Sequence, residues 1–590
     1  MPRNLLTEYA RLFIATLVQQ GIEEVIISPG SRSTPLAIAA LRHPGLTCLS
    51  VVDERSAAFF ALAKSKMTDR SPLLLCTSGT AGANYYPAIL EAEAACVPLV
   101  VVTADRPLFL AHANAQQTTD QQHFFGRHVR FFANFVPLAE KNALRALKYQ
   151  LAQAMEKAHG VFPGPVHLNF HADKPLEPIT ENFGPQEIKL KELVEEIVSS
   201  ELIVCTPKTA RLESQSHYKR ACSLLEKSKR GLLLLGPLLP SRHRDTQCIE
   251  RVAEKTGFCV LAESTSQFRF QTPNKQLLFP DLLSMLGQEM ALPDCILQLG
   301  FPPAAISTNK LLEQHADIPR IVVCEGEWGE PFHGAGMIFH GDMQYNLQQL
   351  EQHLAPSPGQ DAKWHEALYS LCKTCQQKLQ EKLEQNDLTS AFVLHCLGKY
   401  LSKQHVLALG NGLSVRNADT FVPVQAQKCT VWCQRGVNGI DGLVAGAIGA
   451  IFACKGGGVA VLGDVSCLHD IGGFGLCRSL PDFNKPCVLL VMNNQGGRIF
   501  DRLPAAKIWT GKEGDFWTTP HQMNFSSVAA MFDLPYLCLT QKEQVEKGIK
   551  WGLSQNRPVL VEALVQEINM ASVCNELRKK AAHLAGQDTK

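Results

Sequence analysis

The sequence predicts an α/β protein built from three doubly wound parallel-sheet domains. Short apolar runs of strand length alternate with longer amphipathic runs along most of its 590 residues, a pattern typical of parallel sheets with helices on both faces. The chain is also too long for one hydrophobic core, since single cores stop growing at about 250 to 300 residues. The strand-like runs form three series, and each series corresponds to one predicted domain.

The first series follows an N-terminal amphipathic segment that carries Glu8 and Arg11 inside its apolar run. Those charges indicate a helix of the folded protein rather than a signal peptide. The expected strands are residues 23–30, 46–53, 72–79, 97–107 and 164–170. The Pro- and charge-rich stretch 171–192 then predicts a linker. We therefore expect a first domain over residues 1–180.

The second and third series are separated by a charged, helical segment at residues 362–403. The expected strands are residues 231–237, 258–265, 295–301 and 320–326 in the second series, and 405–412, 429–436, 458–466, 486–494 and 557–565 in the third. These series predict a central domain over residues 190–355 and a last domain over residues 370–575.

Composition excludes several classes of protein. The formal net charge is +1, without a cluster of Lys and Arg, which argues against nucleic-acid binding. The longest uncharged apolar stretch is too short to span a bilayer, so we expect a cytoplasmic protein that does not bind membranes. Its 20 cysteines are scattered singly in apolar runs, as buried reduced thiols are. Cys372 and Cys375 have metal-ligand spacing but no second pair, and we interpret them as helix neighbours.

The strongest chemical signal is in the third series. One strand ends at Gly463-Asp464 and a later strand ends at Asn493-Asn494, and carboxyl ends of parallel strands form the ligand crevice of such sheets. Asp464, the Asn494 side-chain oxygen and the Gly496 carbonyl are oxygen ligands of the kind that Mg²⁺ binds together with a diphosphate. Alternatively, Asp464 caps a helix and the following Asn and Gly residues form a turn.

Other phosphate sites fit the sequence less well. The glycines before Asp464 lack the G-x-x-x-x-G-K-[ST] pattern, and no G-x-G-x-x-G opens a helix after a strand with an acidic partner. ATP and NAD are therefore disfavoured.

The spacing of Gly-Asp and Asn-Asn resembles the diphosphate signature of thiamine diphosphate-dependent enzymes. Further motifs, which together span nearly the whole chain, resemble the menaquinone-biosynthesis carboligases of that family. They are "SPGSRSTPLA", "DERSAAFFALA", "CTSGTAGANYYPAILEA", "VTADRP", "QRGVNGIDGL" and "GDVSCLHD". The resemblance implies pyrimidine-binding, central and diphosphate-binding domains, and a transferase that uses thiamine diphosphate with Mg²⁺ or Mn²⁺. Its expected reaction is decarboxylation of 2-oxoglutarate and addition of the succinyl-semialdehyde carbanion to isochorismate, giving 2-succinyl-5-enolpyruvyl-6-hydroxy-3-cyclohexene-1-carboxylate.

The resemblance also assigns roles around the cofactor. Glu54 matches the catalytic glutamate that hydrogen-bonds the aminopyrimidine ring, and Ile440 matches the bulky residue that supports the bent cofactor. Gly463, Ile499 and Phe500 are expected at the same pocket. From the residues alone, other roles stay open: Asp53 could cap the helix that Glu54 enters, Glu54 could simply favour its dipole, and the apolar residues could be core.

Both substrates are dicarboxylates, and arginine donates paired hydrogen bonds to carboxylates. The resemblance places Arg416 and Arg435 at the donor, and Ser31, Arg32, Arg106 and Gln117 at isochorismate. Taken singly, each arginine could equally be a solvated or salt-bridged surface residue.

The chain departs from the family pattern at three places, one of which is "AHANAQQTTDQ" around Gln117, an imperfect version of the family's G-A-N-Q stretch. Gly412 stands where a serine is common, and a basic cluster is reduced to Lys310, which follows Asn309. The resemblance further implies a homodimer or homotetramer with the cofactor between the first region of one subunit and the third of another. Two alternatives remain: another thiamine diphosphate-dependent 2-oxoacid decarboxylase or carboligase, and a non-catalytic homologue, although the latter would be expected to lose Glu54 or Asp464.

Overall fold

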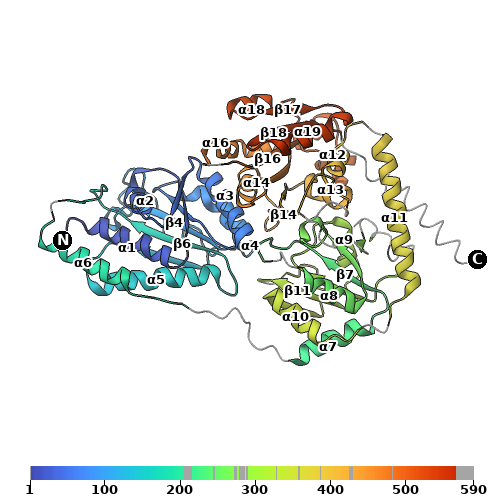
Figure 1. Cartoon of the computed structure of the whole chain (residues 1–590), viewed down its shortest axis with the longest axis horizontal. Coiled ribbons are helices and arrows are strands. Elements are labelled where there is room, and N and C mark those ends of the chain that lie inside the picture. Colours follow the sequence, from blue (N-terminus) through green and yellow to red (C-terminus); the bar gives the residue numbers. More distant parts are fainter. Residues whose placement is uncertain are drawn as a thin grey trace, which may run out of the picture. The chain divides into compact units, whose positions relative to one another are not determined.

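The computed structural model describes residues 2–181, 183–204, 215–242, 246–270, 276–277, 283, 286, 290–326, 329–356, 359–385, 387–423, 429–481 and 483–566. Of the predicted domains, several stretches lie outside the described residues, and the longest two are residues 205–214 and 567–575. The described part contains three six-stranded sheets (Figure 1), and neighbouring strands within each sheet pair in parallel. The predicted fold class is thereby confirmed.

The first sheet has the strand order β2-β1-β3-β4-β6-β5. Its strands are β1 (Glu24–Ile27), β2 (Thr47–Ser50), β3 (Leu73–Cys76), β4 (Leu99–Asp105), β5 (Phe131–Phe135) and β6 (Pro165–His171). Its main helices are α1 (Leu5–Gln19), α2 (Thr34–Leu41), α3 (Glu54–Thr68), α4 (Tyr86–Ala94), α5 (Lys141–His159) and α6 (Pro185–Ser199). Alternate residues of one strand face opposite sides of a sheet. Val25 and Ile27 accordingly join the core formed with α1, α2, α5 and α6. The helix α3 contacts β1, β3 and β4 of the same sheet, and α4 contacts β6.

The second sheet has the order β12-β11-β10-β7-β8-β9, and the third has β14-β13-β15-β16-β18-β17. The second sheet consists of β7 (Gly231–Leu235), β8 (Cys259–Ala262), β9 (Gln276–Leu277), β10 (Cys295–Leu299), β11 (Arg320–Glu325) and β12 (Met337–Gly341). The third consists of β13 (Val406–Leu409), β14 (Thr430–Cys433), β15 (Gly458–Gly463), β16 (Cys487–Asn493), β17 (Tyr536–Leu539) and β18 (Pro558–Leu564). The first and third sheets therefore repeat one topology.

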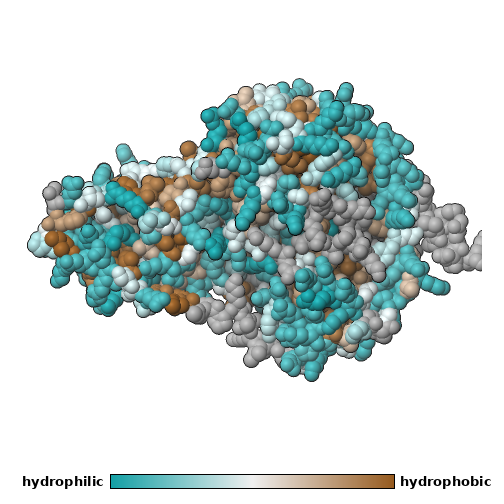
Figure 2. All heavy atoms as spheres, viewed as in Figure 1, coloured by the Kyte–Doolittle hydropathy of each residue, from teal (hydrophilic) through white to brown (hydrophobic). Residues whose placement is uncertain are grey.

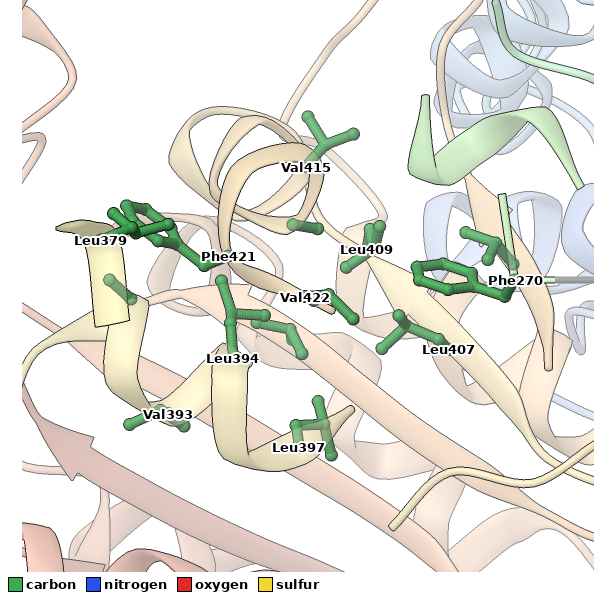
Figure 3. Close-up of a cluster of buried hydrophobic side chains, with 14 of the residues drawn as sticks. Phe270, Leu379, Val393, Leu394, Leu397, Leu407, Leu409, Val415, Phe421 and Val422 are labelled. Carbon is green, nitrogen blue, oxygen red and sulfur yellow. The ribbon is translucent and has the colours of Figure 1, made fainter. Parts of the chain in front are cut away.

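One hydrophobic core serves both the second and the third sheets. Figure 3 shows part of it, where Leu379, Leu394, Leu407 and Phe421 come from different elements. The helices around these two sheets are α7 (Gln215–Lys227), α8 (Gln247–Thr256), α9 (Ile306–Gln314), α10 (Met343–His353), α11 (Ala362–Gln385), α12 (Ser390–Leu397), α13 (Leu413–Phe421), α15 (Asp464–His469), α17 (Gly511–Thr518), α18 (Ser526–Met531) and α19 (Lys542–Ser554). The helix α11 contributes a buried stripe that includes Cys372 and Cys375, which confirms that these cysteines are helix neighbours.

The chain forms two compact units, and each combines segments that are far apart in the sequence. One contains residues 1–208, 434–453 and 470–482, and the other contains residues 209–433, 454–469 and 483–590. The first unit therefore includes α14 (Leu443–Ala453), which packs against α3, and also the short helices η6 (Ile471–Gly475) and α16 (Leu476–Ser479).

Two differences from the predicted elements have physical causes. The prediction of a linker over residues 171–192 is wrong at its end, because α6 begins at Pro185 and packs on α1. Proline at the first helical position and Glu187 in the first turn are ordinary helix-start signals. The sequence patterns also missed β5, β9, β12 and β17, which are short or only partly buried edge strands.

Hydrophilic residues cover most of the face shown in Figure 2, where hydrophobic residues form small separate groups. Among the described helices, none is both long enough and apolar enough to cross a membrane.

Candidate active site

The predicted metal ligands lie at the carboxyl edge of the third sheet. Strands β15 and β16 are neighbours, with Gly463 paired with Met492, so Asp464 and Asn494 follow adjacent strand ends. Asp464 is 2% exposed, whereas Asn494 is half-buried. Parallel pairing in this register explains why residues about thirty positions apart in the sequence meet.

The Asp464 carboxylate is held by three hydrogen bonds. Its Oδ2 atom accepts from the Gly496 amide at 2.9 Å and lies 3.1 Å from Nε2 of His521, and its Oδ1 atom accepts from the Val465 amide at 2.7 Å. The Met523 amide donates to Nδ1 of His521 at 3.0 Å, so Nδ1 is the acceptor nitrogen of the ring. The hydrogen atom is therefore on Nε2, which donates a hydrogen bond to Asp464. Sequence analysis missed His521, because it lies far along the chain in a segment without a motif.

The backbone at Gly496 requires glycine. Its φ angle is +138°, and a Cβ atom there would lie 2.5 Å from the Thr518 carbonyl oxygen. At Gly463, in contrast, the nearest atom to a Cβ would be Ser466 Oγ at 3.9 Å, so protein atoms leave space beside this strand end. A carboxylate, an amide oxygen and a backbone carbonyl next to such a space fit Mg²⁺ with a diphosphate. Within the described residues, no group of three or more His, Cys, Asp or Glu offers an alternative metal site.

Ile499 and Phe500 follow this loop and are both half-buried. The Phe500 ring lies 5.9 Å from the Trp517 ring, and Trp517 in turn stacks on Trp509. A Cβ atom on Gly497 would lie 3.1 Å from the Phe500 ring. Both residues thus follow the Gly496 loop, and Phe500 belongs to an aromatic cluster with Trp509 and Trp517.

Two further predicted substrate residues belong to this unit. Arg416 is half-buried on α13, the helix that follows β13. Gly412 caps this helix with a φ angle of +87°, a conformation that glycine adopts without strain. Lys310 is exposed on α9.

Glu54 is the first residue of α3 and is half-buried. The cap of this helix is Asp53, whose carboxylate accepts from the Arg55 and Ser56 amides at 2.9 and 3.3 Å. The capping function considered in the sequence therefore belongs to Asp53. Among the described residues, none donates a hydrogen bond to the Glu54 carboxylate. Burial raises the pKa of the Cys76 thiol, and the Glu54 carboxylate adds to that rise.

Behind Glu54, an ion pair connects α3 to the segment that follows α15. Arg55 lies 3.3 Å from Asp470, which is fully buried and also accepts from the Ala445 amide of α14 at 2.9 Å. Burial raises the pKa of Asp470 to about 6, although the Ala445 hydrogen bond and Arg55 oppose the rise. The half-buried Ile440 lies just before α14, in the same unit as Glu54.

The predicted isochorismate residues gather near the ends of β1, β3 and β4. Arg32 is buried, and its guanidinium donates to the Ala172 carbonyl at 2.7 Å. Burial and the charge of Arg106 lower the pKa of Arg32, so the two arginines are neighbours. Gln117 has a φ angle of +53° and donates to the Ser78 carbonyl at 3.3 Å. Ser31 is exposed at the start of the same short helix as Arg32.

A cavity of about 270 Å³ opens beside Arg106, with His171 and Thr118 also in its wall. Ser31, Arg32 and Gln117 do not line it. The four predicted isochorismate residues are thus only partly brought together. Arg106 lines the cavity, and Arg32 is its neighbour but does not line the cavity.

A buried polar network, which sequence analysis missed, supports Arg106. Asn169 donates to Asp105 at 2.8 Å and accepts from Gln121 at 3.0 Å, and Asp105 accepts from the Arg106 amide at 2.7 Å. His171 Nδ1 lies 2.6 Å from the Arg106 carbonyl oxygen. The sequence signal for this network was the alternation of His167, Asn169 and His171 along the buried strand β6. A strand of a covered parallel sheet normally carries apolar residues, and buried polar side chains need hydrogen-bond partners.

Comparison with known proteins supports a single family. A family model described as "Thiamine pyrophosphate enzyme, N-terminal TPP binding domain" matches residues 7–124. The chain is 34% identical to the 2-succinyl-5-enolpyruvyl-6-hydroxy-3-cyclohexene-1-carboxylate synthase of Sorangium cellulosum, over 98% of this chain and 97% of that protein. It is 35% identical to the synthase of the same name from Geobacillus kaustophilus over 90% of each chain, and 32% identical to that of Listeria monocytogenes over 92% of each.

Proposed function

Because the chain belongs to the family of 2-succinyl-5-enolpyruvyl-6-hydroxy-3-cyclohexene-1-carboxylate synthases, we propose that it is a thiamine diphosphate-dependent carboligase of menaquinone biosynthesis. It decarboxylates 2-oxoglutarate and adds the succinyl-semialdehyde carbanion to isochorismate. The observation that carries this proposal is the pairing of a buried Asp464 with the Gly496 amide across two adjacent strand ends, in a chain that matches these synthases over nearly its full length.

Asp464, the Asn494 side-chain oxygen and the Gly496 carbonyl would hold Mg²⁺ or Mn²⁺. The hydrogen bonds from the Gly496 amide and His521 keep the Asp464 carboxylate in one orientation, so that a cation meets a pre-set ligand. Gly463 would leave room for the diphosphate, while Ile499 and Phe500 would flank the cofactor. When bound, thiamine diphosphate supplies the electron sink that decarboxylation requires.

Glu54 would hydrogen-bond the aminopyrimidine ring, and Ile440 would support the bent form of the cofactor. The Asp53 cap supports the role of Glu54, because Asp53 already satisfies the first amides of α3 and leaves the Glu54 carboxylate for a ligand. The half-buried position of Glu54 favours a hydrogen bond that bulk water does not weaken.

Charge is the basis of the proposed substrate contacts. Arg416 and Arg435 would bind the carboxylate of the succinyl group. Arg106, in the wall of the cavity, and its neighbour Arg32 would bind isochorismate together with Ser31 and Gln117, which lie outside the cavity lining. Lys310 is proposed as an additional cation for substrate binding. All of these assignments rest on the family motifs, together with the neighbouring positions of Arg32 and Arg106.

Pyrimidine-binding, central and diphosphate-binding domains over residues 1–180, 190–355 and 370–575 are proposed on the positions of the three sheets. A homodimer or homotetramer and a cytoplasmic location are proposed on the family resemblance alone.

The direct test is mass analysis of the product formed from 2-oxoglutarate and isochorismate with thiamine diphosphate and Mg²⁺. We expect CO₂ release and an adduct that contains both the succinyl group and the isochorismate ring. Decarboxylation without the adduct would indicate another carboligase of the family, and no turnover of 2-oxoglutarate would indicate a non-catalytic homologue.

A further inference from the structure

A buried ion pair in the first unit holds the segment that carries Arg435. Lys66, in the last turn of α3, lies 2.7 Å from the Glu91 carboxylate on α4, and the two side chains are only 3% and 2% exposed. Glu91 Oε1 also accepts from the Gly436 amide at 3.0 Å, and Oε2 accepts from the Val437 amide at 2.8 Å. One carboxylate therefore satisfies a cation and two successive amides.

A buried ion pair is a poor way to hold two helices together, because apolar side chains do so without losing hydration. What a carboxylate adds is a pair of acceptors for backbone amides. Lys66 then supplies the positive charge that pairs with the buried Glu91 carboxylate. The arrangement is thus suited to fixing the backbone at Gly436 and Val437.

Glycine at position 436 makes the contact possible. A Cβ atom there would lie 2.9 Å from both the Glu91 carbonyl oxygen and its Oε2 atom. The other end of the segment is fixed on α3, since a Cβ on Gly442 would overlap the Phe59 ring at 1.9 Å. The segment between residues 436 and 442 is therefore clamped at both ends.

We propose that Glu91, paired with Lys66, is a positioning residue that sets the place of Arg435 in the donor site. Arg435 precedes the clamped Gly436 directly, so any shift of this backbone moves the Arg435 side chain. The inference rests on the proposed function, since it assumes that Arg435 binds the carboxylate of 2-oxoglutarate. No contact of Glu91 with substrate or cofactor is part of it.

The test compares Glu91→Gln with a matched control in the other unit. The amide side chain of this variant would present an NH₂ group to a backbone N–H, so one of the two backbone hydrogen bonds is lost. We expect KM for 2-oxoglutarate to rise about tenfold with kcat within about threefold, as for a misplaced binding group. Lys66→Arg keeps the cation and should stay close to wild type. Gly436→Ala should also raise KM, because its Cβ atom would press against the Glu91 carbonyl oxygen and Oε2 and displace the backbone that Glu91 holds.

The control is Glu330→Gln. Glu330 pairs with Arg320 at 2.5 Å, both are buried, and Glu330 accepts from the Phe332 and Gly334 amides. Glu330 therefore makes the same contacts as Glu91, with one buried cation and two backbone amides, but no proposed site residue adjoins those amides. Glu330→Gln should lower thermal stability and leave KM for 2-oxoglutarate unchanged.

A double-mutant cycle decides whether Glu91 acts through Arg435. The tenfold effect of Glu91→Gln should disappear when Arg435 is already replaced by alanine, because coupled residues are not additive. Equal effects of Glu91→Gln in both backgrounds, or loss of kcat with KM unchanged, would overturn the inference. A wild-type enzyme that does not turn over 2-oxoglutarate would instead overturn the proposed function. Hydrogen exchange at Gly436 and Val437 offers a readout independent of substrate, and unchanged protection in Glu91→Gln would refute the clamp.

Discussion

Replacement of Asp470 by asparagine should make the free energy of unfolding of the first unit less dependent on pH. Asp470 is fully buried, and burial raises its pKa from 3.8 to about 6 against the opposing Ala445 hydrogen bond and Arg55 charge, with Asp53 adding to the rise. At about 1.4 kcal/mol for each pH unit, this rise corresponds to about 3 kcal/mol. The folded state thus holds the Asp470 proton more tightly than the unfolded state does.

The sign of the effect follows from linkage. The stabilisation by protonated Asp470 is complete below the unfolded pKa of 3.8 and is lost as the pH rises through about 6. Between about pH 4.5 and 7.5 the wild type should therefore lose about 2 kcal/mol relative to Asp470→Asn. In thermal melts this loss corresponds to about 4 to 8 °C for a unit of this size.

The assay is a series of thermal melts of both proteins across this pH range, with the exposed Asp515→Asn as a control. The quantity compared is the change of melting temperature with pH. A difference in melting temperature that is the same at every pH also contains the effect of the altered contact with Arg55. Control and wild type should give parallel profiles, and the Asp470→Asn profile should diverge from both. A parallel Asp470→Asn profile would show that the buried carboxylate does not hold its proton as argued.

Four further outcomes are expected. Glu54→Gln should lower turnover by about 10² to 10⁴ at saturating cofactor, since proton-transfer assistance is lost; a loss of only a few-fold would exclude the role. Asp464→Ala should abolish the thermal stabilisation by thiamine diphosphate plus Mg²⁺, and unchanged stabilisation would mean that Asp464 is only structural. Gly496→Ala should do the same by driving a methyl group into the Thr518 carbonyl, and cofactor titrations that match wild type would contradict this. Arg416→Ala should lower kcat/KM for 2-oxoglutarate by about ten- to 150-fold with much less effect on pyruvate, and parallel losses would refute the assignment.

The sequence was sufficient to predict three parallel sheets, apart from some of their edge strands, and the strand ends at which Asp464 and Asn494 lie. The strands of the third series are continuous apolar runs because both faces of a parallel sheet are covered, and such runs are easy to locate. Asp464 and Asn494 could be paired because adjacent strand ends share one edge of the sheet. The edge strand β12, by contrast, alternates buried and partly exposed residues, so its run is not uniformly apolar.

Contacts across long sequence separations could not be predicted. His521 lies 57 positions from Asp464, and Gly436 lies 345 positions from Glu91. The apolar α14 gave no indication of its partner, because a helix that is buried all round has no polar face to orient it. Its close packing on α3 requires glycine at position 449, because a Cβ atom there would lie 2.7 Å from the Phe60 carbonyl oxygen. The sequence of α14 alone does not show that Phe60 is its neighbour.

The first and third sheets show how one topology supports two chemistries. In each sheet the equivalent first strands, β1 and β13, lead to the helices that carry Arg32 and Arg416. The equivalent strands β4 and β16 are followed directly by Arg106 and Asn494. Strand order fixes where these residues stand, but the residue type decides what can bind there. Cations after both β1 and β4 favour a dicarboxylate at the first sheet. At the third, Arg416 suits a carboxylate, and the oxygen ligands at the ends of β15 and β16 suit a cation with its diphosphate.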